Sequence, residues 1–518
     1  MQGPGQILSV AAARRPDKTA LITATRSLTY AELDDASTRA AGALLRRGVR
    51  PGRVVSLFGP NTWQWVVAYH AILKAGAIVN PINSMLTPPE VAYILGDAES
   101  TAILATAAQV STVADLTGEL PELTGVFALD AEVAGHETLM DLAAESPTSL
   151  PPAPEPTATS TIGYTSGTTG HPKGAVQTQR AVLFNCALTA TAHSRGPDDV
   201  CVTALPAPHV YGNVVINGTF LAGGTLVLHQ RFEPEPFLDS LAEHRATIID
   251  AVPAMYAVML ASPALARADF SGVTRSVSGG QTISATTIEA WEDRSDSRFL
   301  ELWGMTELSG PATSQTFFMP RSPGSVGQSF PGTEVRIADL ADASRDAAKD
   351  TPGELMVRGP LVMTGYFNNP DATKLAIEPD GWLHTGDIAR LDDDGNVWMV
   401  DRRGDMIITG GYNVYPAEIE RVLAAHPAVA LVAVGSVPDA VRGELACAYV
   451  ILKEGSTVSP ADLIDSTKDS LAPYKRPRLI RFVTDLPRTS SGKIMRRKLL
   501  EHADAAGAAP AAGPGAAP

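Results

Sequence analysis

In the N-terminal part of the chain, segments with the spacing of a buried helix face alternate with short apolar runs. Across residues 30–47, leucine and alanine recur at helical spacing, and the pattern stops at Gly48. Residues 54–58 form a short apolar run that predicts a strand. Residues 63–74 are helical again, and 76–80 return to a strand. Such alternation predicts a parallel sheet covered by helices.

The pattern changes character near Asp401. Up to that point further buried strands are expected at 201–205, 225–228, 247–252, 273–278 and 299–302. Beyond it, a smaller pattern predicts helices at 417–425 and 460–470 and strands at 430–436 and 446–452. We therefore predict an α/β fold with a large N-terminal domain of helix-covered sheets (1–401), a hinge (402–405) and a small, mobile C-terminal α+β lid domain (406–504). Residues 505–518 are almost only Ala, Gly and Pro and are predicted to be disordered.

Composition narrows the class of protein. An apolar content of 45% with 19% charged residues is ordinary for a soluble globular enzyme. The net charge of -15 argues against a nucleic-acid partner, because such proteins need a basic surface. Three separated cysteines indicate a reducing compartment. Neither a secretory signal nor a transmembrane segment is visible, so a cytoplasmic protein is expected, and a homo-oligomer is compatible with the sequence.

One segment, from Tyr164 to Gly174, has the composition of a loop that wraps a polyphosphate. Its glycines allow backbone N–H groups to turn inward, its hydroxyls donate hydrogen bonds, and Lys173 adds a positive charge. A Walker loop would need Ser or Thr after that lysine, where this chain has Gly174. A flexible linker is the alternative, but an apolar helical run follows directly at 181–188. The residues proposed to bind phosphate are Thr165, Ser166, Gly167, Thr168, Thr169, Gly170 and Lys173.

This loop resembles the phosphate loop of the adenylate-forming (AMP-binding) superfamily, and in particular its acyl-CoA synthetase branch. The resemblance extends in motif order from about Tyr30 to about Leu499. It implies an acid–thiol ligase that uses ATP, Mg²⁺ and coenzyme A. A carboxylate would attack the α-phosphate of ATP, and a thiol would then displace AMP from the acyl-adenylate.

The segment Trp303-Gly304-Met305-Thr306-Glu307 resembles the nucleotide-contacting motif of that family. A flat ring before a glycine can stack on a purine, and many members have tyrosine where this chain has Trp303. Thr306 is expected to donate to the α-phosphate, and Glu307 offers an oxygen ligand for Mg²⁺.

Other matches complete the expected nucleotide and thiol sites. Asp387, in a Thr-Gly-Asp turn, and Arg402 match family residues that reach the ribose. Gly280 and Gln281 belong to a loop under the adenine. The pair Gly410 and Gly411, followed by Tyr412, matches the motif that lines the pantetheine tunnel.

The resemblance also assigns catalytic and acyl-pocket residues. Lys493 matches the lysine that the lid brings into the active site, and His209 the histidine over the carboxylate site. By alignment Gly404 stands at the pivot of the hinge, where Asp or Lys is usual, and Asp405 could share the role. The expected acid-binding residues are His209, Tyr211, Gly212, Asn213, Gly279 and Met305.

The acid itself is inferred from what the presumed pocket lacks. Its segments contain no Arg or Lys to neutralise a second carboxylate and present no Asp for an amino group. A medium- or long-chain fatty acid is the first expectation, and an aryl or cinnamate-type acid the second. Two other classes stay open: a standalone adenylation enzyme that loads a carrier protein, and a non-catalytic binding protein on this fold.

Overall fold

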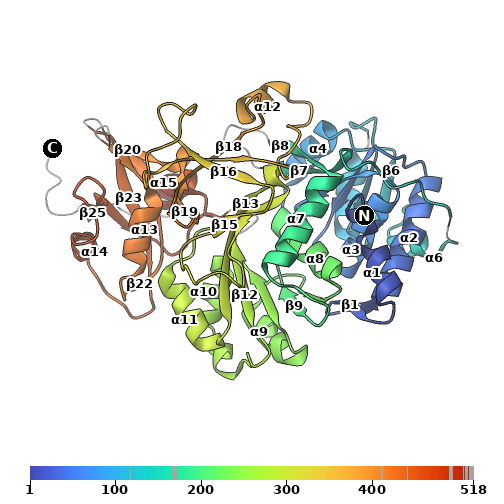
Figure 1. Cartoon of the computed structure of the whole chain (residues 1–518), viewed down its shortest axis with the longest axis horizontal. Helices are drawn as coiled ribbons and strands as arrows, with labels where there is room; N and C mark the ends of the chain where they lie inside the picture. Colours follow the sequence, from blue (N-terminus) through green and yellow to red (C-terminus); the bar gives the residue numbers. More distant parts are fainter. Residues whose placement is uncertain are drawn as a thin grey trace. The chain divides into compact units, whose positions relative to one another are not determined.

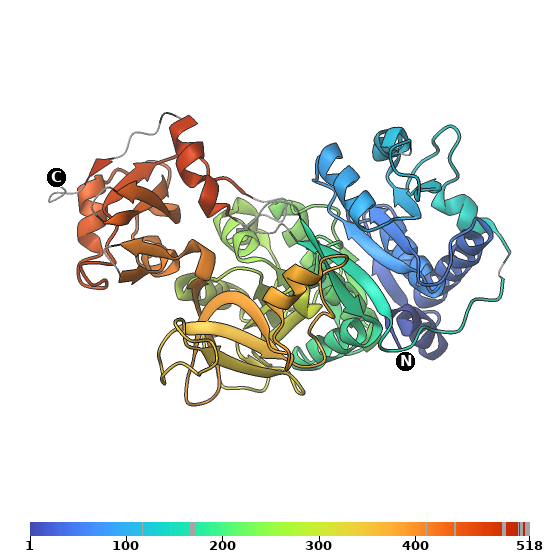
Figure 2. The same cartoon turned by 90° about the horizontal axis from the view of Figure 1, so that it is seen from above.

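The chain folds into two compact units. The computed structural model describes residues 1–116, 118–146, 148–165, 172–409, 412–439, 442–488, 494–505, 507 and 511–512. The first unit comprises Met1–Ile283, Thr287–Val335 and Val357–His384, and the second comprises Ser284–Thr286, Arg336–Met356 and Thr385–Pro518. Figures 1 and 2 show the chain in two views.

Two sheets organise the first unit. The six-stranded sheet follows the order β6 (Gly125–Ala128), β5 (Ala102–Ala105), β3 (Val54–Phe58), β4 (Ile78–Ile82), β7 (Thr159–Thr165), β8 (Lys173–Thr178). The nine-stranded sheet follows β15 (Gln328–Ser329), β14 (Gly310–Ser314), β13 (Arg298–Met305), β12 (Arg275–Gly279), β11 (Ile248–Ala251), β9 (Val200–Thr203), β10 (Thr225–Leu228), β1 (Thr19–Ile22), β2 (Ser27–Thr29). Their central strands are parallel, as the alternating pattern predicts.

Helices cover these sheets, and Figure 1 shows α9, α10 and α11 along the sheet that contains β12. The helical segments of the first unit are η1 (Pro4–Gln6), α1 (Ile7–Arg14), α2 (Tyr30–Arg46), α3 (Trp63–Lys74), α4 (Pro88–Asp97), α5 (Ala107–Leu116), α6 (Leu139–Ala144), α7 (Gln179–Ala192), α8 (Val210–Ala222), α9 (Pro234–Glu243), α10 (Pro253–Ala261), η2 (Pro263–Arg267), α11 (Ala285–Ser295), η3 (Thr306–Leu308) and α12 (Pro370–Ala376). The first residues of α11 are assigned to the second unit.

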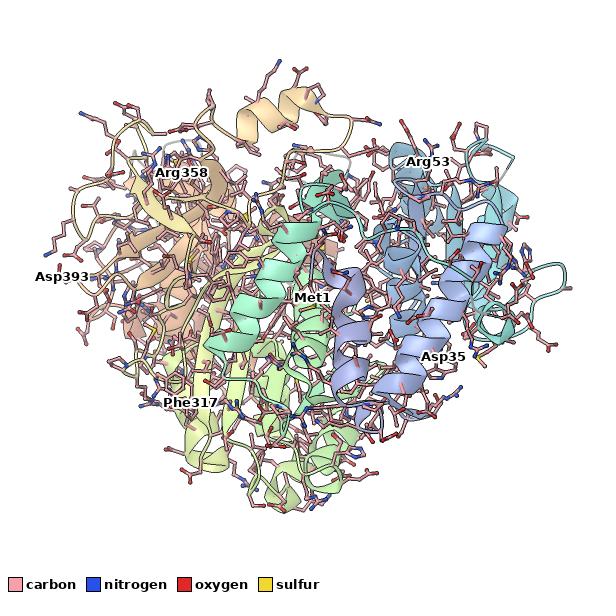
Figure 3. The ribbon with its side chains drawn as sticks, turned by 45° about the vertical axis from the view of Figure 1, so that its right-hand side comes forward. Met1, Asp35, Arg53, Phe317, Arg358 and Asp393 are labelled. Carbon is pink, nitrogen blue, oxygen red and sulfur yellow. The ribbon has the colours of Figure 1, made fainter. Side chains whose placement is uncertain are left out.

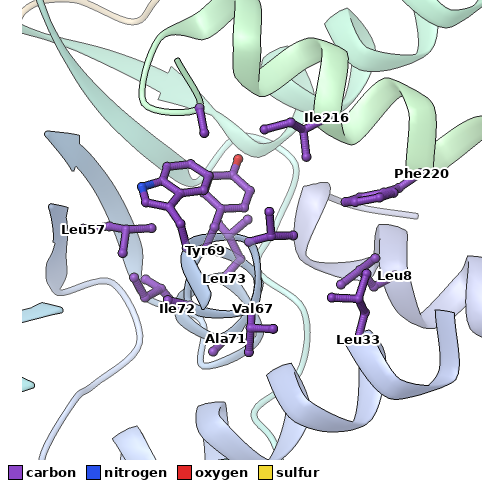
Figure 4. Close-up of a cluster of buried hydrophobic side chains, with 14 of the residues drawn as sticks. Leu8, Leu33, Leu57, Val67, Tyr69, Ala71, Ile72, Leu73, Ile216 and Phe220 are labelled. Carbon is purple, nitrogen blue, oxygen red and sulfur yellow. The ribbon is translucent and has the colours of Figure 1, made fainter. Parts of the chain in front are cut away.

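The helix α3 lies at the centre of the largest core cluster. Almost all of its residues are buried, as expected for a helix that is apolar on every side. Figure 4 shows it surrounded by side chains from α1, α2, α8 and β3, among them Leu8, Phe220 and Leu57. Its one lysine, Lys74, is buried and pairs with Asp34 at 2.6 Å. The helix ends where Gly76 takes a left-handed φ of 74°, so the next strand begins at Ile78 rather than at residue 76.

A capping box begins α2. The Thr29 hydroxyl accepts from the Glu32 N–H, and the Glu32 carboxylate accepts from the Thr29 N–H. Helices α1 and α2 run side by side, and Asp35 lies on the solvent face of α2 (Figure 3) while Leu33 is buried. The alternation of polar and apolar positions along residues 30–47 therefore identifies the face of α2 that packs on the core.

The second unit contains a smaller α+β arrangement. One sheet follows β21 (Tyr412–Val414), β20 (Ile407–Thr409), β23 (Gly443–Leu452), β24 (Leu479–Phe482), β25 (Ala511–Ala512), with β22 (Val429–Asp439) also on β23. The other sheet, most of whose residues belong to this unit, follows β16 (Glu334–Ala338), β17 (Gly353–Arg358), β18 (Leu383–Leu391), β19 (Val397–Arg402). The helical segments are η4 (Arg403–Asp405), α13 (Pro416–Ala424), α14 (Pro460–Ser466), η5 (Arg496–Lys498) and α15 (Leu499–Ala505).

These elements confirm the predicted fold class of a large α/β part and a small α+β part. The helix predicted over 460–470 is shorter, because Thr467 caps α14 and its hydroxyl donates to the Ile464 carbonyl at 2.6 Å. Most of the segment 505–518 lies outside the described residues. Within the part of the chain that the structure describes, no helix has the length and apolarity needed to cross a bilayer. The three cysteines, Cys186, Cys201 and Cys447, are buried free thiols.

Candidate active site

The predicted phosphate loop connects the two strands of an antiparallel hairpin. β7 ends at Thr165 and β8 begins at Lys173, and these residues are paired in the register. The two strands lie side by side in Figure 2. Two predicted phosphate-binding residues are thus at the base of the loop. The others, Ser166, Gly167, Thr168, Thr169 and Gly170, lie outside the described residues.

A long-range hydrogen bond holds the base of this loop. The hydroxyl of Tyr164 donates to a carboxylate oxygen of Asp97, the last residue of α4, at 2.6 Å. Burial, and then the hydrogen bond to Asp97 and its charge, raise the pKa of Tyr164, so its phenol stays a neutral donor. Gly174 opposite leaves room for the ring, because a Cβ there would lie 3.0 Å from the Tyr164 ring. Sequence reasoning did not identify Asp97.

The nucleotide motif forms a sharp turn between β13 and β14. Trp303 is buried, and Gly304 packs directly on backbone, because a Cβ at Gly304 would lie 2.2 Å from the Gly310 carbonyl oxygen. Thr306 and Glu307 begin the short helix η3, which ends at Ser309 in a left-handed conformation with φ 59°. This turn fixes the direction of both side chains at the end of β13.

Three neighbours hold Thr306 and Glu307. Gln177 of β8 donates to the Thr306 carbonyl oxygen at 2.9 Å. The Glu307 carbonyl oxygen accepts from the Met363 N–H at 2.8 Å, and its buried carboxylate accepts from the Tyr366 hydroxyl at 2.9 Å. Gln177 and Tyr366 are site residues that the sequence did not reveal.

A cavity of about 50 Å³ opens between these elements. This volume is several times the roughly 10–15 Å³ that one water molecule needs. Its lining includes the predicted residues His209, Asn213 and Thr306, so the first unit brings the proposed acid site and the proposed phosphate site together. The full lining is Pro81, Thr161, Gly163, Tyr164, Gln177, Val182, Pro208, His209, Val210, Asn213, Thr306 and Ser309.

His209 begins α8 as its N-cap. Its Nδ1 accepts from the Tyr211 N–H at 3.3 Å, so the neutral ring carries its proton on Nε2. Asn213, one turn further, accepts from the Tyr69 hydroxyl at 3.1 Å. Tyr211 and Gly212 contact the core instead of lining the cavity, and a Cβ at Gly212 would lie 2.2 Å from the Pro206 carbonyl oxygen.

The loop predicted under the adenine follows β12. A Cβ at Gly279 would lie 2.2 Å from Leu302 of β13, so glycine lets these strands approach. Gly280 turns the chain with φ 87° before the partly exposed Gln281. Gly279, Gly280, Gln281 and Met305 are not among the residues that line the cavity.

The second unit contains the predicted ribose residues. Asp387 of β18 and Arg402 of β19 are paired across the ladder, and Arg402 Nε lies 3.3 Å from Asp387 Oδ1. Asp387 is buried while Arg402 is exposed, so the arginine places a positive charge beside a carboxylate whose position is fixed. Tyr412 is exposed and stacks on Tyr474, with ring centroids 4.6 Å apart. The predicted residues Gly410, Gly411 and Lys493 lie outside the described residues.

The hinge segment is held by an arginine from the C-terminal part of the same unit. Arg496 contacts Asp401 at 3.0 Å and Asp405 at 3.1 Å, and it also pairs with Glu420. Burial raises the pKa of Asp401 to about 6. Gly404 lies between Asp401 and Asp405 in the sequence, and a Cβ there would lie 3.2 Å from the Arg497 guanidinium.

The donor set fits Mg²⁺ that is bound mainly by substrate. Among the described residues no group of three or more His, Cys, Asp or Glu could hold an ion. Glu307 offers a single carboxylate next to Thr306, which lines the cavity. Mg²⁺ in such sites takes one or two carboxylates and completes its shell with phosphate oxygens and water.

The sequence was compared with family models and with known proteins, and both comparisons find AMP-binding enzymes or CoA ligases. Residues 8–367 match the family model of the AMP-binding enzyme, and 418–493 that of the AMP-binding enzyme C-terminal domain. A Mycobacterium tuberculosis protein named 3-[(3aS,4S,7aS)-7a-methyl-1,5-dioxo-octahydro-1H-inden-4-yl]propanoyl:CoA ligase is 36% identical, over 94% of this chain and 96% of its own length. A long-chain-fatty-acid–CoA ligase of Bacillus subtilis is 32% identical, over 96% and 93%.

Solved structures of CoA ligases have a similar fold. The anthranilate CoA ligase AuaEII, in complex with anthranoyl-AMP, matches with a TM-score of 0.91 at 28% identity, and the match covers 98% of each chain. The fold, the hairpin loop and these matches define an AMP-forming acid–CoA ligase, an enzyme class whose members use ATP and CoA. The chain belongs to the AMP-binding enzyme family.

Proposed function

We propose that this ligase activates a monocarboxylic acid with an uncharged, apolar body, and that a medium- or long-chain fatty acid is the first candidate. The observation that carries this proposal is the lining of the cavity. Among the described residues that line it, none is Asp, Glu, Lys or Arg, and His209 is the one titratable imidazole. A second carboxylate or an ammonium group would lose its hydration there without gaining a partner.

Adenylation requires two anions to meet. At about 4 Å and an effective dielectric of about 20, two unit charges repel by about 4 kcal/mol. Lys173, at the base of the phosphate loop, supplies one compensating charge. Thr306 donates a hydrogen bond to the α-phosphate, and His209 orients the acid. Mg²⁺ held through Glu307, when bound, adds positive charge at the phosphate oxygens.

The second unit is proposed to contribute the remaining groups. Asp387 accepts hydrogen bonds from the ribose hydroxyls, with Arg402 beside it. Lys493 enters for adenylation and leaves by rotation at the hinge 402–405, after which Gly410, Gly411 and Tyr412 line the path of the thiol. Adenylation needs extra positive charge because two anions meet, whereas thioester formation does not bring them together. A lysine on a mobile segment can supply that charge for the first half-reaction and leave before the second.

A compact aryl or cinnamate-type acid is the second candidate. The part of the lining that the structure describes contains no charged side chain that would exclude an aromatic ring. The relatives described above are named for substrates as different as a propanoate that carries a dioxo-octahydroindene ring system, a long-chain fatty acid and anthranilate. Both fatty acids and aryl acids have an apolar body that is compatible with the uncharged lining.

The test is acid-dependent exchange of pyrophosphate into ATP, measured on the purified full chain. The panel includes octanoate, palmitate, cinnamate and, as a dicarboxylate of small size, malonate. We expect exchange with apolar monocarboxylates and only background with malonate. Fastest exchange with malonate would contradict the proposal. Coenzyme A and a phosphopantetheinyl carrier protein are then compared as acceptors of the acyl group.

A further inference from the structure

One aromatic ring, that of Tyr366, contacts both Glu307 and Lys173. The hydroxyl of Tyr366 donates to Glu307 Oε1 at 2.9 Å. The face of the same ring lies 5.3 Å from Lys173 Nζ, within the range of a cation–π interaction. The proposed metal ligand and the proposed phosphate cation are therefore both oriented by Tyr366, although neither is near it in sequence.

The backbone around Tyr366 is fixed to the strand that carries Lys173. Thr364 and Phe367 donate N–H groups to carbonyl oxygens of β8, and the Val176 N–H donates to the Gly365 carbonyl at 2.9 Å. The Tyr366 N–H donates to the Thr373 hydroxyl at 2.8 Å. Gly365 permits this path, because its φ is 152° and a Cβ would lie 2.8 Å from Thr373. The ring is therefore attached to a rigid support and not to a free loop.

The hydroxyl bond selects the orientation of the carboxylate. Glu307 is buried, and a hydrogen bond to a buried ionised oxygen is stronger than one between neutral groups. With Oε1 held by the phenol, rotation of the carboxylate about its terminal bond is restricted. The oxygen that a metal would meet is thus set in advance, which lowers the ordering cost of binding.

The ring face has a separate effect on Lys173. The ammonium is attracted to the negative face of the aromatic system without transfer of a proton or full neutralisation. A lysine with four rotatable bonds is therefore kept near the loop base in the absence of phosphate. The hydroxyl acts on the metal ligand and the ring acts on the cation, so substitutions can separate the two effects.

We propose that Tyr366 is a positioning residue for nucleotide binding: its hydroxyl orients Glu307 toward the metal of Mg·ATP, and its ring holds Lys173 at the phosphate loop. This inference rests on the proposed roles of Glu307 and Lys173 in adenylation. No step of the reaction is assigned to Tyr366 itself.

The test measures binding without turnover. Isothermal titration of the full chain, with no acid present, gives the affinity for Mg·ATP and for ATP in excess chelator. The ratio of these affinities reports the contribution of the metal. Tyr366→Phe removes the hydroxyl and keeps the ring, whereas Tyr366→Leu removes both. Tyr474→Phe, which removes a hydroxyl from an exposed tyrosine in the other unit, is the matched control.

We expect Tyr366→Phe to lower the Mg·ATP affinity by up to about 10-fold, the cost of ordering one side chain on binding, and to leave metal-free ATP binding unchanged. Tyr366→Leu should weaken metal-free ATP binding as well, while Tyr474→Phe should match the wild type. Thermal unfolding checks that each variant is folded, and Tyr366→Phe fills the same space as tyrosine.

Two results would overturn the proposal. A wild-type affinity ratio in Tyr366→Phe would show that the hydroxyl does not orient the metal ligand. Equal weakening of Mg·ATP and metal-free ATP in that variant would show a purely structural role. If the wild type releases no pyrophosphate with any acid, the proposed function fails, while the binding ratio still reports on Tyr366.

Discussion

The methyl group of Thr306 occupies the space in front of Gly163: a Cβ at Gly163 would lie 2.7 Å from Thr306 Cγ2. Both residues line the cavity, and Gln177 holds the Thr306 backbone from the same side. The absence of a side chain on β7 is therefore what lets the nucleotide motif approach the phosphate-loop hairpin.

Gly163→Ala should consequently displace Thr306. Because a misplacement of about 1 Å can cost about 100-fold in rate, we expect pyrophosphate exchange to fall by about that factor. The variant should unfold near the wild-type temperature, since the close contacts are with two side chains at a cavity, Thr306 and Gln177. Gly118→Ala is the control, because no atom lies within 4 Å of the added Cβ. Wild-type exchange in Gly163→Ala would mean that Thr306 does not need this position.

Tyr164→Phe should weaken ATP binding. The variant loses the 2.6 Å hydrogen bond to Asp97 that anchors the base of the phosphate loop. The bond is worth about 1.5–3 kcal/mol, but it exists before ATP binds, so only the part that keeps the loop base ordered is lost from binding, and we expect about a 10-fold rise in the KM for ATP. Asp97→Ala should give a similar rise, and the double variant little more, because both remove one interaction. Additive effects would show that the two residues act separately.

The buried carboxyl of Glu301 predicts a pH dependence of stability. Burial raises its pKa from the usual 4.5 to about 8, although the Gly324 N–H donates to it at 2.6 Å. Below pH 4.5 both the folded and the unfolded states are protonated. Between pH 4.5 and 8 the folded state retains a proton that the unfolded state loses, so this contribution to stability declines as pH rises and is lost above pH 8.

Glu301→Gln should remove that slope, because the amide resembles the protonated acid and can still accept from Gly324. Denaturant unfolding at pH 5.5, 7 and 8.5 measures it, with the wild type compared at each pH. The difference between variant and wild type should grow in favour of the variant as pH rises. A constant difference would contradict the raised pKa.

The pair of Arg195 and Asp250 is fully buried, with nitrogen and oxygen 2.7 Å apart. Removal of one partner leaves an uncompensated charge in the core, so Asp250→Ala should lower the free energy of unfolding by about 3–5 kcal/mol. The exposed pair of Arg267 and Asp239 provides the control, and Asp239→Ala should cost at most about 1 kcal/mol. Equal costs for both variants would contradict the burial argument.

Lys493→Ala separates the two half-reactions. We expect adenylation to fall by about 10²–10³-fold, by analogy with the loss of a donor to a transition state. Thioester formation from synthetic acyl-adenylate and coenzyme A should be spared, because the lysine is proposed to have left by then. Rapid-quench measurement of each half-reaction tests this, and equal losses in both would refute the division of roles between the two units.

Local pattern was sufficient to predict much of the scaffold. The bounds of α3, β3 and β10 follow from apolar runs and helical spacing, since each is buried on nearly all sides. The composition of the loop after Tyr164 indicated a phosphate site, and the structure places its two ends on a hairpin. The end of α14 was missed, because the capping hydroxyl of Thr467 overrides a pattern that continues beyond it.

The partners of the site residues could not be predicted in the same way. Tyr366 and Glu307 are 59 residues apart, and Tyr164 and Asp97 are 67 apart. No periodicity relates such positions, because the contacts arise only when separate strands are paired and a helix ends beside them. The role of Gly163 is also invisible in sequence, since it depends on which side chain fills the space that glycine leaves.

The central claim is that the enzyme binds an apolar monocarboxylate in this cavity and joins it to AMP. The most direct measurement is the rate of pyrophosphate exchange into ATP as a function of the added acid. We predict saturable exchange with octanoate, palmitate or cinnamate, and background rates with malonate or with no acid. Absence of exchange with every acid, in protein that still binds ATP, would contradict the account.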